Sequence, residues 1–358
     1  MEKKKIGVIA DWDADGVVSA AIIIYVQEKL GKFPIRGKVK PEIHPAGPRS
    51  ISEVVNSLIK EENTCWENLV ILDIPYTNSV EEALKEAKEK CNSKIYYFDH
   101  HESTIDNMAQ LEEKYNAFIV VGKSPTAVLL QRFLDGMGIR LTPRLYEFVR
   151  AVAVLEGSKR MVSGDEEIPQ GIVDLAASIS KSLNQMRSKN AWIKYARWLS
   201  NPIPFEGELI RIGSEKEDLL KKGMEISKLN DEEIRSMAMD LALSARNLGY
   251  IKFVDARGKW DKRGSSALAS AIYRILGKPV AVLFEKDDGS RILIIRSSRG
   301  NALKIIEVLD REGAVEDKGG HGNIGIAKLR DEVTIKRLEK LLIRASFEVV
   351  RREALDQH

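Results

Sequence analysis

The 358-residue sequence has little cysteine, little net charge and no long hydrophobic run near its start. Its two cysteines, Cys65 and Cys91, lack CxxC spacing and a nearby histidine, so we expect two thiols and neither a zinc site nor a disulfide framework. A net charge of +3 is too small to attract nucleic acid by itself. Any site for a polyanion must therefore be a local basic patch.

The apolar run that follows the opening Met-Glu-Lys-Lys-Lys is too short for a signal peptide or a membrane span. We therefore expect a cytoplasmic protein with no membrane partner. Hydrophobic residues make up 44% of the chain and charged residues 30%, which suits buried cores under a well-solvated surface. The length is ample for two domains.

The first half alternates short apolar runs with helical patterns. Such runs between helices are typical of a parallel sheet that is covered on both faces. We expect strands before His44 and over 6–10, 69–73, 94–98 and 118–121, and helices over 17–30, 51–60 and 80–91.

The rest of the chain changes character twice. Residues 141–243 are almost wholly helical in pattern, and from 249 to about 350 strands return, with a hairpin over 280–297 around an Asp-Gly turn. The prediction is an α/β fold: a parallel-sheet domain over 1–160, a helical region and connector over 161–245, and a smaller α/β domain over 246–358.

Three of the predicted strands end in acidic or histidine residues. Asp11, Asp13 and Asp15 follow the first strand, Asp73 ends another, and Asp99-His100-His101 follows a third. In open α/β sheets the ligand crevice lies beyond the carboxyl ends of the strands. Carboxylates this close repel one another unless a divalent cation lies between them, so we expect a metal site. An EF-hand is excluded because the terminal Glu is missing and a strand precedes the loop.

These motifs carry a family resemblance. DWDADG, LVILDIP and DHH, in this order, resemble motifs of the DHH phosphoesterase superfamily, and Gly319-Gly320-His321-Gly322-Asn323 resembles the GGH motif of its associated C-terminal domain. Members include RecJ exonucleases, nanoRNases that also act on pAp, cyclic-dinucleotide phosphodiesterases and type II pyrophosphatases. The resemblance implies a DHH catalytic domain joined to a substrate-binding domain, with a cleft between them.

The resemblance also implies roles for single residues. Asp13, Asp15 and Asp73 bind two Mn²⁺ ions, for which Mg²⁺ or Co²⁺ can substitute, and His100 is a further ligand. Asp99 and Asp11 support this site without binding an ion, and His101 faces the scissile phosphate. Two such ions polarise the phosphoryl oxygens and activate a water for in-line attack.

The sequence departs from the family pattern at the fourth motif, where an Asp is usual. The best match is Glu156 after an apolar helical segment, and Asp165 is the alternative. Some members also carry a His where this chain has Ile9. Glu has one methylene more than Asp, which displaces the carboxylate, and geometric errors near 1 Å in an active site lower the reaction rate.

For the C-terminal domain, the resemblance implies phosphate binding by the Gly319-Gly320 amides, His321, Asn323 and Arg296. Three further interpretations stay open. For Ser124-Pro-Thr126 the alternatives are phosphate binding and helix capping. For His44 and Arg49 the alternatives are a place on the same rim and a purely structural role in a turn. A basic loop either binds a nucleic-acid backbone or is only solvated. Its residues are Arg257, Lys259, Lys262 and Arg263.

We therefore expect Mn²⁺-dependent hydrolysis of single-stranded DNA or RNA from an end. The chain has no match to the extra domains of long RecJ proteins, which favours short oligonucleotides; pAp and cyclic dinucleotides stay open. The rival function is a catalytically dead RecJ-like partner of the replicative helicase and GINS, or of a repair complex. Retention of Asp13, Asp15, Asp73 and His100 argues for the enzyme.

Overall fold

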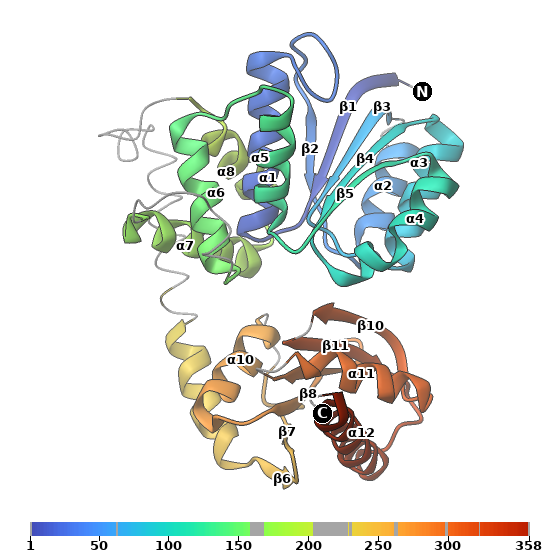
Figure 1. Ribbon diagram of the computed structural model, residues 1–358, viewed down its shortest axis with the longest axis vertical. Coiled ribbons are helices and arrows are strands. Elements are labelled where there is room, and N and C mark those ends of the chain that lie inside the picture. The colour runs from blue at the N-terminus through green and yellow to red at the C-terminus, as the bar shows by residue number, and fades with distance from the viewer. Residues whose placement is uncertain are drawn as a thin grey trace. The chain divides into compact units, whose positions relative to one another are not determined.

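A computed structural model describes residues 2–61, 64–157, 168–202, 228, 231–260, 264–297, 300–321 and 323–356. Contacts divide the chain into two compact units, Met1–Ser227 and Lys228–His358. Each unit has its own sheet (Figure 1). Among the helices that the structure describes, none combines the length and the apolar character that crossing a bilayer requires.

The first unit is built on a five-stranded sheet in the order β2-β1-β3-β4-β5, and all of its strand pairs are parallel. The strands are β1 (Glu2–Ala10), β2 (Glu42–Pro45), β3 (Thr64–Leu72), β4 (Lys94–Asp99) and β5 (Phe118–Val121). This order reverses direction between β1 and β3. In sheets of this order, ligands bind at that switch point, beyond the carboxyl ends of the strands.

Helices cover both faces of this sheet, which confirms the predicted α/β architecture (Figure 1). One face carries α2 (Ile51–Lys60), α3 (Asn78–Cys91) and α4 (Glu102–Tyr115). The other carries α1 (Ala14–Ile24), α5 (Thr126–Gly136), α6 (Pro143–Leu155), α7 (Gln170–Met186) and α8 (Lys189–Leu199). The helices α7 and α8, which belong to the predicted helical region, pack into the core of the first unit.

The helix expected over 17–30 has two parts. It begins earlier, as α1, and continues as a π-helical segment, Tyr25–Leu30, which ends at Gly31 in the left-handed conformation. All of α1 is buried, since the sheet lies on one side and other helices on the other. A helix that is apolar all round is typical of such a position.

Cys65 in β3 and Cys91 at the end of α3 form a disulfide, with their Cα atoms 5.3 Å apart. The expectation of two thiols is therefore wrong. The two cysteines are 26 residues apart, and the segment between them includes most of β3 and all of α3. Because α3 runs back along the sheet, its end lies beside the start of β3. This return is a tertiary contact, which the cysteine spacing could not reveal.

Cys65→Ser is expected to lower the free energy of unfolding of the oxidised protein by about 3.5 kcal/mol, because the cross-link restricts the unfolded chain over a loop of this length. Denaturant unfolding measures the loss. Wild-type protein treated with a reductant should fall to the same stability. An unchanged midpoint in both samples would contradict the cross-link.

The second unit holds a six-stranded mixed sheet in the order β10-β11-β9-β8-β7-β6. Its strands are β6 (Arg246–Leu248), β7 (Ile251–Asp255), β8 (Val280–Glu285), β9 (Arg291–Arg296), β10 (Val315–His321) and β11 (Ile324–Leu329). A helix over 231–243 and α10 (Ser265–Leu276) cover one face, and α11 (Asn301–Arg311) and α12 (Ile335–Asp356) the other. The antiparallel pairing of β8 with β9 confirms the predicted hairpin.

Candidate metal centre

The three polar clusters of the first unit meet at one edge of its sheet. Ala10, Leu72 and Phe98, the last apolar residues before the clusters, are level with one another in β1, β3 and β4. The ladder continues beyond them, since Asp11 N donates to Leu72 O (3.3 Å) and Asp73 N to Phe98 O (2.9 Å). The clusters therefore flank the β1/β3 switch point, where a ligand site is expected.

Asp13 and Gly16 set the turn from β1 into α1. Asp13 is the N-cap of α1, and its Oδ1 accepts a hydrogen bond from Gly16 N (3.1 Å). A Cβ atom on Gly16 would lie 2.4 Å from Asp11 O, so no larger residue fits without a backbone shift. The turn holds Asp11, Asp13 and Asp15 together at the start of the helix.

Asp15 is almost fully buried, with 1% of its surface exposed. Its two carboxylate oxygens accept hydrogen bonds from Thr126 N and Ala127 N, each at 2.7 Å. These amides form the first turn of α5, where the helix dipole favours an anion. The start of α5 thus binds a carboxylate of the protein itself. No side chain of Ser124-Pro-Thr126 caps the helix, whose N-cap is Pro125, so the helix-cap interpretation is wrong.

Asp73 has an unusual backbone and a buried side chain. Its φ of 59° lies in the left-handed region, which aspartate tolerates better than most residues. Thr126 Oγ1 donates to Asp73 Oδ1 (2.9 Å), and His100 Nε2 lies 3.3 Å from the same oxygen. His100 Nε2 is also 4.0 Å from Asp15 Oδ2. Asp15, Asp73 and His100 therefore face one another across a few ångströms.

Asp99 is fully buried and holds the second histidine. His101 Nδ1 lies 2.8 Å from Asp99 Oδ1, and Thr104 Oγ1 donates to Asp99 Oδ2. Burial would raise the pKa of Asp99, but the charge and hydrogen bond of His101 outweigh it and the pKa is lowered. Burial would lower the pKa of His101, yet Asp99 outweighs it and raises that pKa to about 9. In the metal-free protein, Asp99 therefore favours the protonated form of His101.

The pKa values of several acidic groups at this edge of the sheet are raised. The pKa of Asp15 is raised to about 8 by burial and by Asp13, and that of Asp11 to about 7 by the same two causes. Burial and the charge of Asp15 raise the pKa of Asp73 well above its usual value. A divalent cation would remove this repulsion, and carboxylates with one imidazole suit Mn²⁺ or Mg²⁺.

One group of residues in the described part of the chain can hold a single ion directly. Ligand atoms of Asp73, His100 and His101 all lie within 4.8 Å of one another. Asp13 and Asp15 stand beside this group, since both of their charges raise the pKa of Asp73. The residues present therefore fit a metal, and the assignment of each ligand stays a prediction.

Glu156 lies close enough to this cluster to interact with it. It is the C-cap of α6, and its charge contributes to the raised pKa of Asp15. Its own pKa is raised to about 7, by desolvation first and by Asp13 second, although the side chain keeps substantial exposure to solvent. Asp165, the alternative, lies outside the described residues.

Solved structures with this architecture include nucleases and phosphodiesterases. RecJ of Thermus thermophilus in complex with Mn²⁺ has a TM-score of 0.64 at 15% identity, over 96% of this chain and 52% of that chain. The same RecJ has also been crystallised with Mg²⁺. The pGpG-specific phosphodiesterase PggH of Vibrio cholerae has a TM-score of 0.54 at 13% identity, over 95% of this chain and 98% of that chain.

CDC45 of Entamoeba histolytica has a TM-score of 0.55 at 8% identity, over 96% of this chain and 95% of that chain. The chain has the fold that these RecJ, PggH and CDC45 structures share. It spans about half the length of the T. thermophilus RecJ chain. No protein-family model and no curated protein sequence matches it. At these identities the likeness establishes the fold alone.

In the second unit of this RecJ-like fold, the predicted phosphate-binding residues lie around one hairpin. Gly319 and Gly320 are in β10 rather than in a loop, and Ile324 in β11 is level with Arg296 at the end of β9. Gly320 has φ 125°, and a Cβ atom there would lie 2.1 Å from Ile324 O. Asn323 Oδ1 accepts from Gly300 N (3.1 Å), just before α11.

Arg296 is half-buried and donates to Ser270 Oγ. Its pKa is lowered by burial and by Arg274. The side chain of His321 lies outside the described residues, as does Gly322. The structure thus brings the backbone of this motif beside Arg296, and their role in binding phosphate stays a prediction.

Other residues that contact the candidate centre come from α5, α7 and α8. Thr126 bonds to both Asp15 and Asp73, across separations of 111 and 53 residues. Trp192 Nε1 donates to Asp11 O (3.1 Å), and the guanidinium of Arg187 stacks 5.0 Å from the Trp12 ring. Sequence reasoning missed Arg187 and Trp192 because nothing in a helical pattern indicates which turn reaches the sheet edge.

The remaining predicted residues divide between the rim and other places. His44 is buried at the end of β2 and Arg49 is exposed in the loop that follows. A Cβ atom on Gly47, in that loop, would lie 3.8 Å from Asp11 Oδ1, so the loop borders the centre. In the basic loop Arg257 pairs with Asp255 at 2.8 Å, while Lys262 and Arg263 lie outside the described residues.

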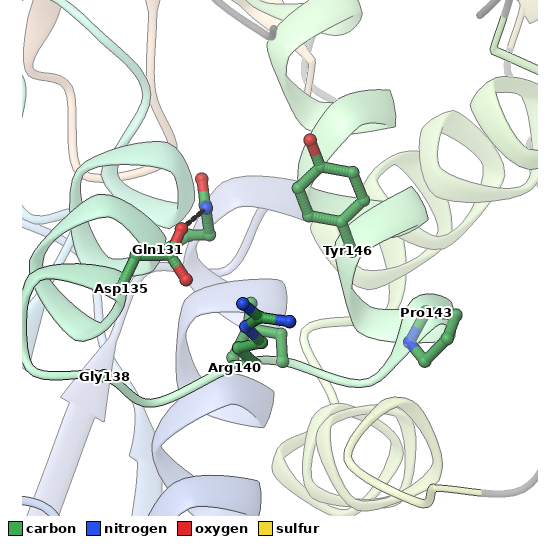
Figure 2. Close-up of a pocket in the computed structure, with 7 residues that line it drawn as sticks. Gln131, Asp135, Gly138, Arg140, Pro143 and Tyr146 are labelled. Atoms are coloured by element: carbon green, nitrogen blue, oxygen red, sulfur yellow. Dashed lines mark hydrogen bonds between the residues drawn. The ribbon is translucent and has the colours of Figure 1, made fainter. Parts of the chain in front are cut away.

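A separate pocket of about 630 Å³ lies between α5 and α6 (Figure 2). Asp135 and Gln131 line one side, Tyr146 the other, and Arg140 points into the space between them. This pocket is at the C-terminal end of α5, whereas Thr126 contacts the metal-centre carboxylates at its N-terminal end. It therefore does not belong to the candidate centre.

Proposed function

We propose that the protein is a metal-dependent phosphodiesterase that hydrolyses single-stranded or short nucleic acid from an end. The observation that carries the proposal is the meeting of Asp15, Asp73 and His100 at the β1/β3 switch point. Mn²⁺ is the preferred ion, with Mg²⁺ or Co²⁺ as substitutes, and two ions are proposed. The predicted compartment is the cytoplasm.

Each residue has a distinct task in the proposed reaction. Asp13, Asp15, Asp73 and His100, with Glu156 beside them, hold the ions, which when bound polarise the phosphoryl oxygens and lower the pKa of water. Thr126 keeps Asp73 in position through its hydroxyl group. His101, kept protonated by Asp99, places a positive charge where negative charge develops on the phosphate.

A second candidate function is a binding protein of a replication or repair complex. Similarity to CDC45 and Glu156 in the position of the usual Asp favour it. Similarity to PggH keeps cyclic or linear dinucleotides open as substrates of the same chemistry, beside pAp. The strong mutual repulsion of Asp15 and Asp73 favours the enzyme, since a binding protein has no need of it.

The test is incubation with Mn²⁺ and end-labelled RNA and DNA oligonucleotides of different lengths, beside pAp and dinucleotides. We expect products that shorten from one end, and no product in the presence of a chelator. His100→Ala should reduce the rate by about 10³-fold, since several kcal/mol of stabilisation by the metal is lost.

The control is Gln110→Ala, at an exposed position of α4, and it should leave the rate unchanged. Cleavage of none of these substrates would contradict the enzymatic function. Cleavage that survives in His100→Ala would contradict the assignment of the site.

A further inference from the structure

The outward face of α12 carries cations and two exposed apolar side chains along one line. At 100° per residue, six exposed residues fall within an arc of about 100°. They are Lys336, Lys340, Ile343, Arg344, Phe347 and Arg351, and we call them the α12 stripe. Leu338, Leu342, Ala345 and Val349 lie on the opposite face and pack into the core of the second unit.

Two acidic residues of α12, Glu339 and Glu348, are turned away from this stripe and are paired within the second unit. Glu339 pairs with Arg246 at 2.5 Å, and Glu348 with Arg311 and Arg352, both at 2.8 Å. By helical position, neither Glu339 nor Glu348 falls on the arc of the stripe. Four cations therefore stand together on a chain whose net charge is only +3.

The apolar members of the stripe are unusually exposed. Phe347 has 68% of its surface accessible and Ile343, one turn before it, 47%. Arg344 lies next to both and reaches Glu312 at 3.1 Å, with 67% of its side chain exposed. An exposed aromatic ring among cations is the arrangement that single-stranded nucleic acid uses, with bases stacked on the ring and phosphates on the cations.

We propose that the α12 stripe binds the backbone of a single-stranded nucleic acid, with a base stacked on Phe347. From Lys336 to Arg351 the stripe is about 22 Å long, which suits a few consecutive phosphates of one extended strand. This proposal rests on the nucleic-acid substrate of the proposed function. It adds that strands long enough to cover the stripe bind more tightly than mono- or dinucleotides.

The test measures binding separately from cleavage. Fluorescence anisotropy of a labelled oligothymidylate of roughly 20 nucleotides is followed in a chelator, over a range of salt concentrations. The variant is Lys336→Ala/Lys340→Ala/Arg351→Ala, which leaves the Arg344–Glu312 pair in place. The matched control, Lys32→Ala/Lys38→Ala/Lys85→Ala, removes the same charge from exposed positions of the first unit.

The stripe variant should bind the strand at least about tenfold more weakly, with a salt slope shallower by about 2, as expected for three lost phosphate contacts. Phe347→Ala should weaken binding about fivefold or more through lost stacking. The control should change Kd less than about twofold. Cleavage of a trinucleotide should stay at the wild-type rate in all three variants, which also verifies their folding.

Equal binding by the stripe variant and the control would overturn the proposal. The proposal would also be overturned if the wild-type stripe binds anionic phosphatidylserine vesicles but the stripe variant binds the strand as tightly as the wild-type protein does. If no substrate is cleaved but the stripe variant still loses strand binding, the proposed enzymatic function fails and the stripe stands. If cleavage proceeds and strand binding is independent of α12, only the stripe fails.

Discussion

Asp73→Asn is expected to stabilise the metal-free protein and to abolish its hydrolytic activity. Asp73 is 2% exposed, and burial and the charge of Asp15 raise its pKa well above the usual value. An uncharged amide of the same shape removes the repulsion and can still accept the hydrogen bond of Thr126. It is also a poor metal ligand, so activity should fall by about 10³-fold.

The sign of the stability change depends on pH. A carboxyl group with a raised folded-state pKa gives stability that is present below its unfolded pKa and lost as pH rises through the folded value. The gain from Asp73→Asn should therefore be absent near pH 4 and reach roughly 1 kcal/mol, or a melting temperature about 3 °C higher, near pH 8.

Thermal unfolding in a chelator at the two pH values measures this gain. Asp106→Asn, an exposed acid on α4, is the matched control and should change neither stability nor rate. If Asp73→Asn destabilises the metal-free protein at both pH values, Asp73 has an ordinary structural role. Full activity in the variant would contradict its place in the centre.

His101→Asn is expected to lower kcat by about 10²–10³-fold, the usual cost of one donor that stabilises charge in a transition state. The reason is that Asp99 Oδ1, 2.8 Å from His101 Nδ1, favours the protonated imidazole that donates to the phosphate in the proposed reaction. The effect should fall on kcat more than on KM, since the charge on the phosphate grows in the transition state. A change confined to KM would indicate that His101 only binds the substrate.

Asp99→Asn keeps the imidazole of His101 but removes the carboxylate that favours its protonated form. Without the carboxylate the pKa of His101 falls, so the alkaline limb of the kcat profile should move to lower pH by about one unit or more. Thr104 also donates to Asp99, and Thr104→Ser keeps that hydroxyl and should leave the limb in place. If the alkaline limb of the kcat profile does not move in Asp99→Asn, that limb reflects the titration of a group other than His101.

The sequence predicted what depends on local pattern. Apolar runs before Asp11, Asp73 and Asp99 predicted three strands, and parallel pairing then required their ends to share one edge. Contacts between distant segments were out of reach. The Cys65–Cys91 disulfide and the bonds of Thr126 to the metal-centre carboxylates depend on how α3 and α5 return across the sheet.

The same limit applies in the second unit. The resemblance indicated a phosphate-binding role for Gly319-Gly320, but it did not reveal that the pair belongs to β10, whose pairing with β11 places it beside Arg296. A Gly-Gly pair weakens any strand prediction because glycine has low β propensity. The positive φ of Gly320 and the contact that a Cβ atom would make with Ile324 O explain why glycine is needed in this strand.

Anomalous diffraction from crystals grown with Mn²⁺ tests the metal centre most directly. We predict two manganese peaks roughly 3.5–4 Å apart, coordinated by Asp13, Asp15, Asp73 and His100. In crystals of Asp73→Asn at least one peak should be lost. Manganese bound elsewhere, or no peak at the carboxyl ends of β1, β3 and β4, would contradict the account.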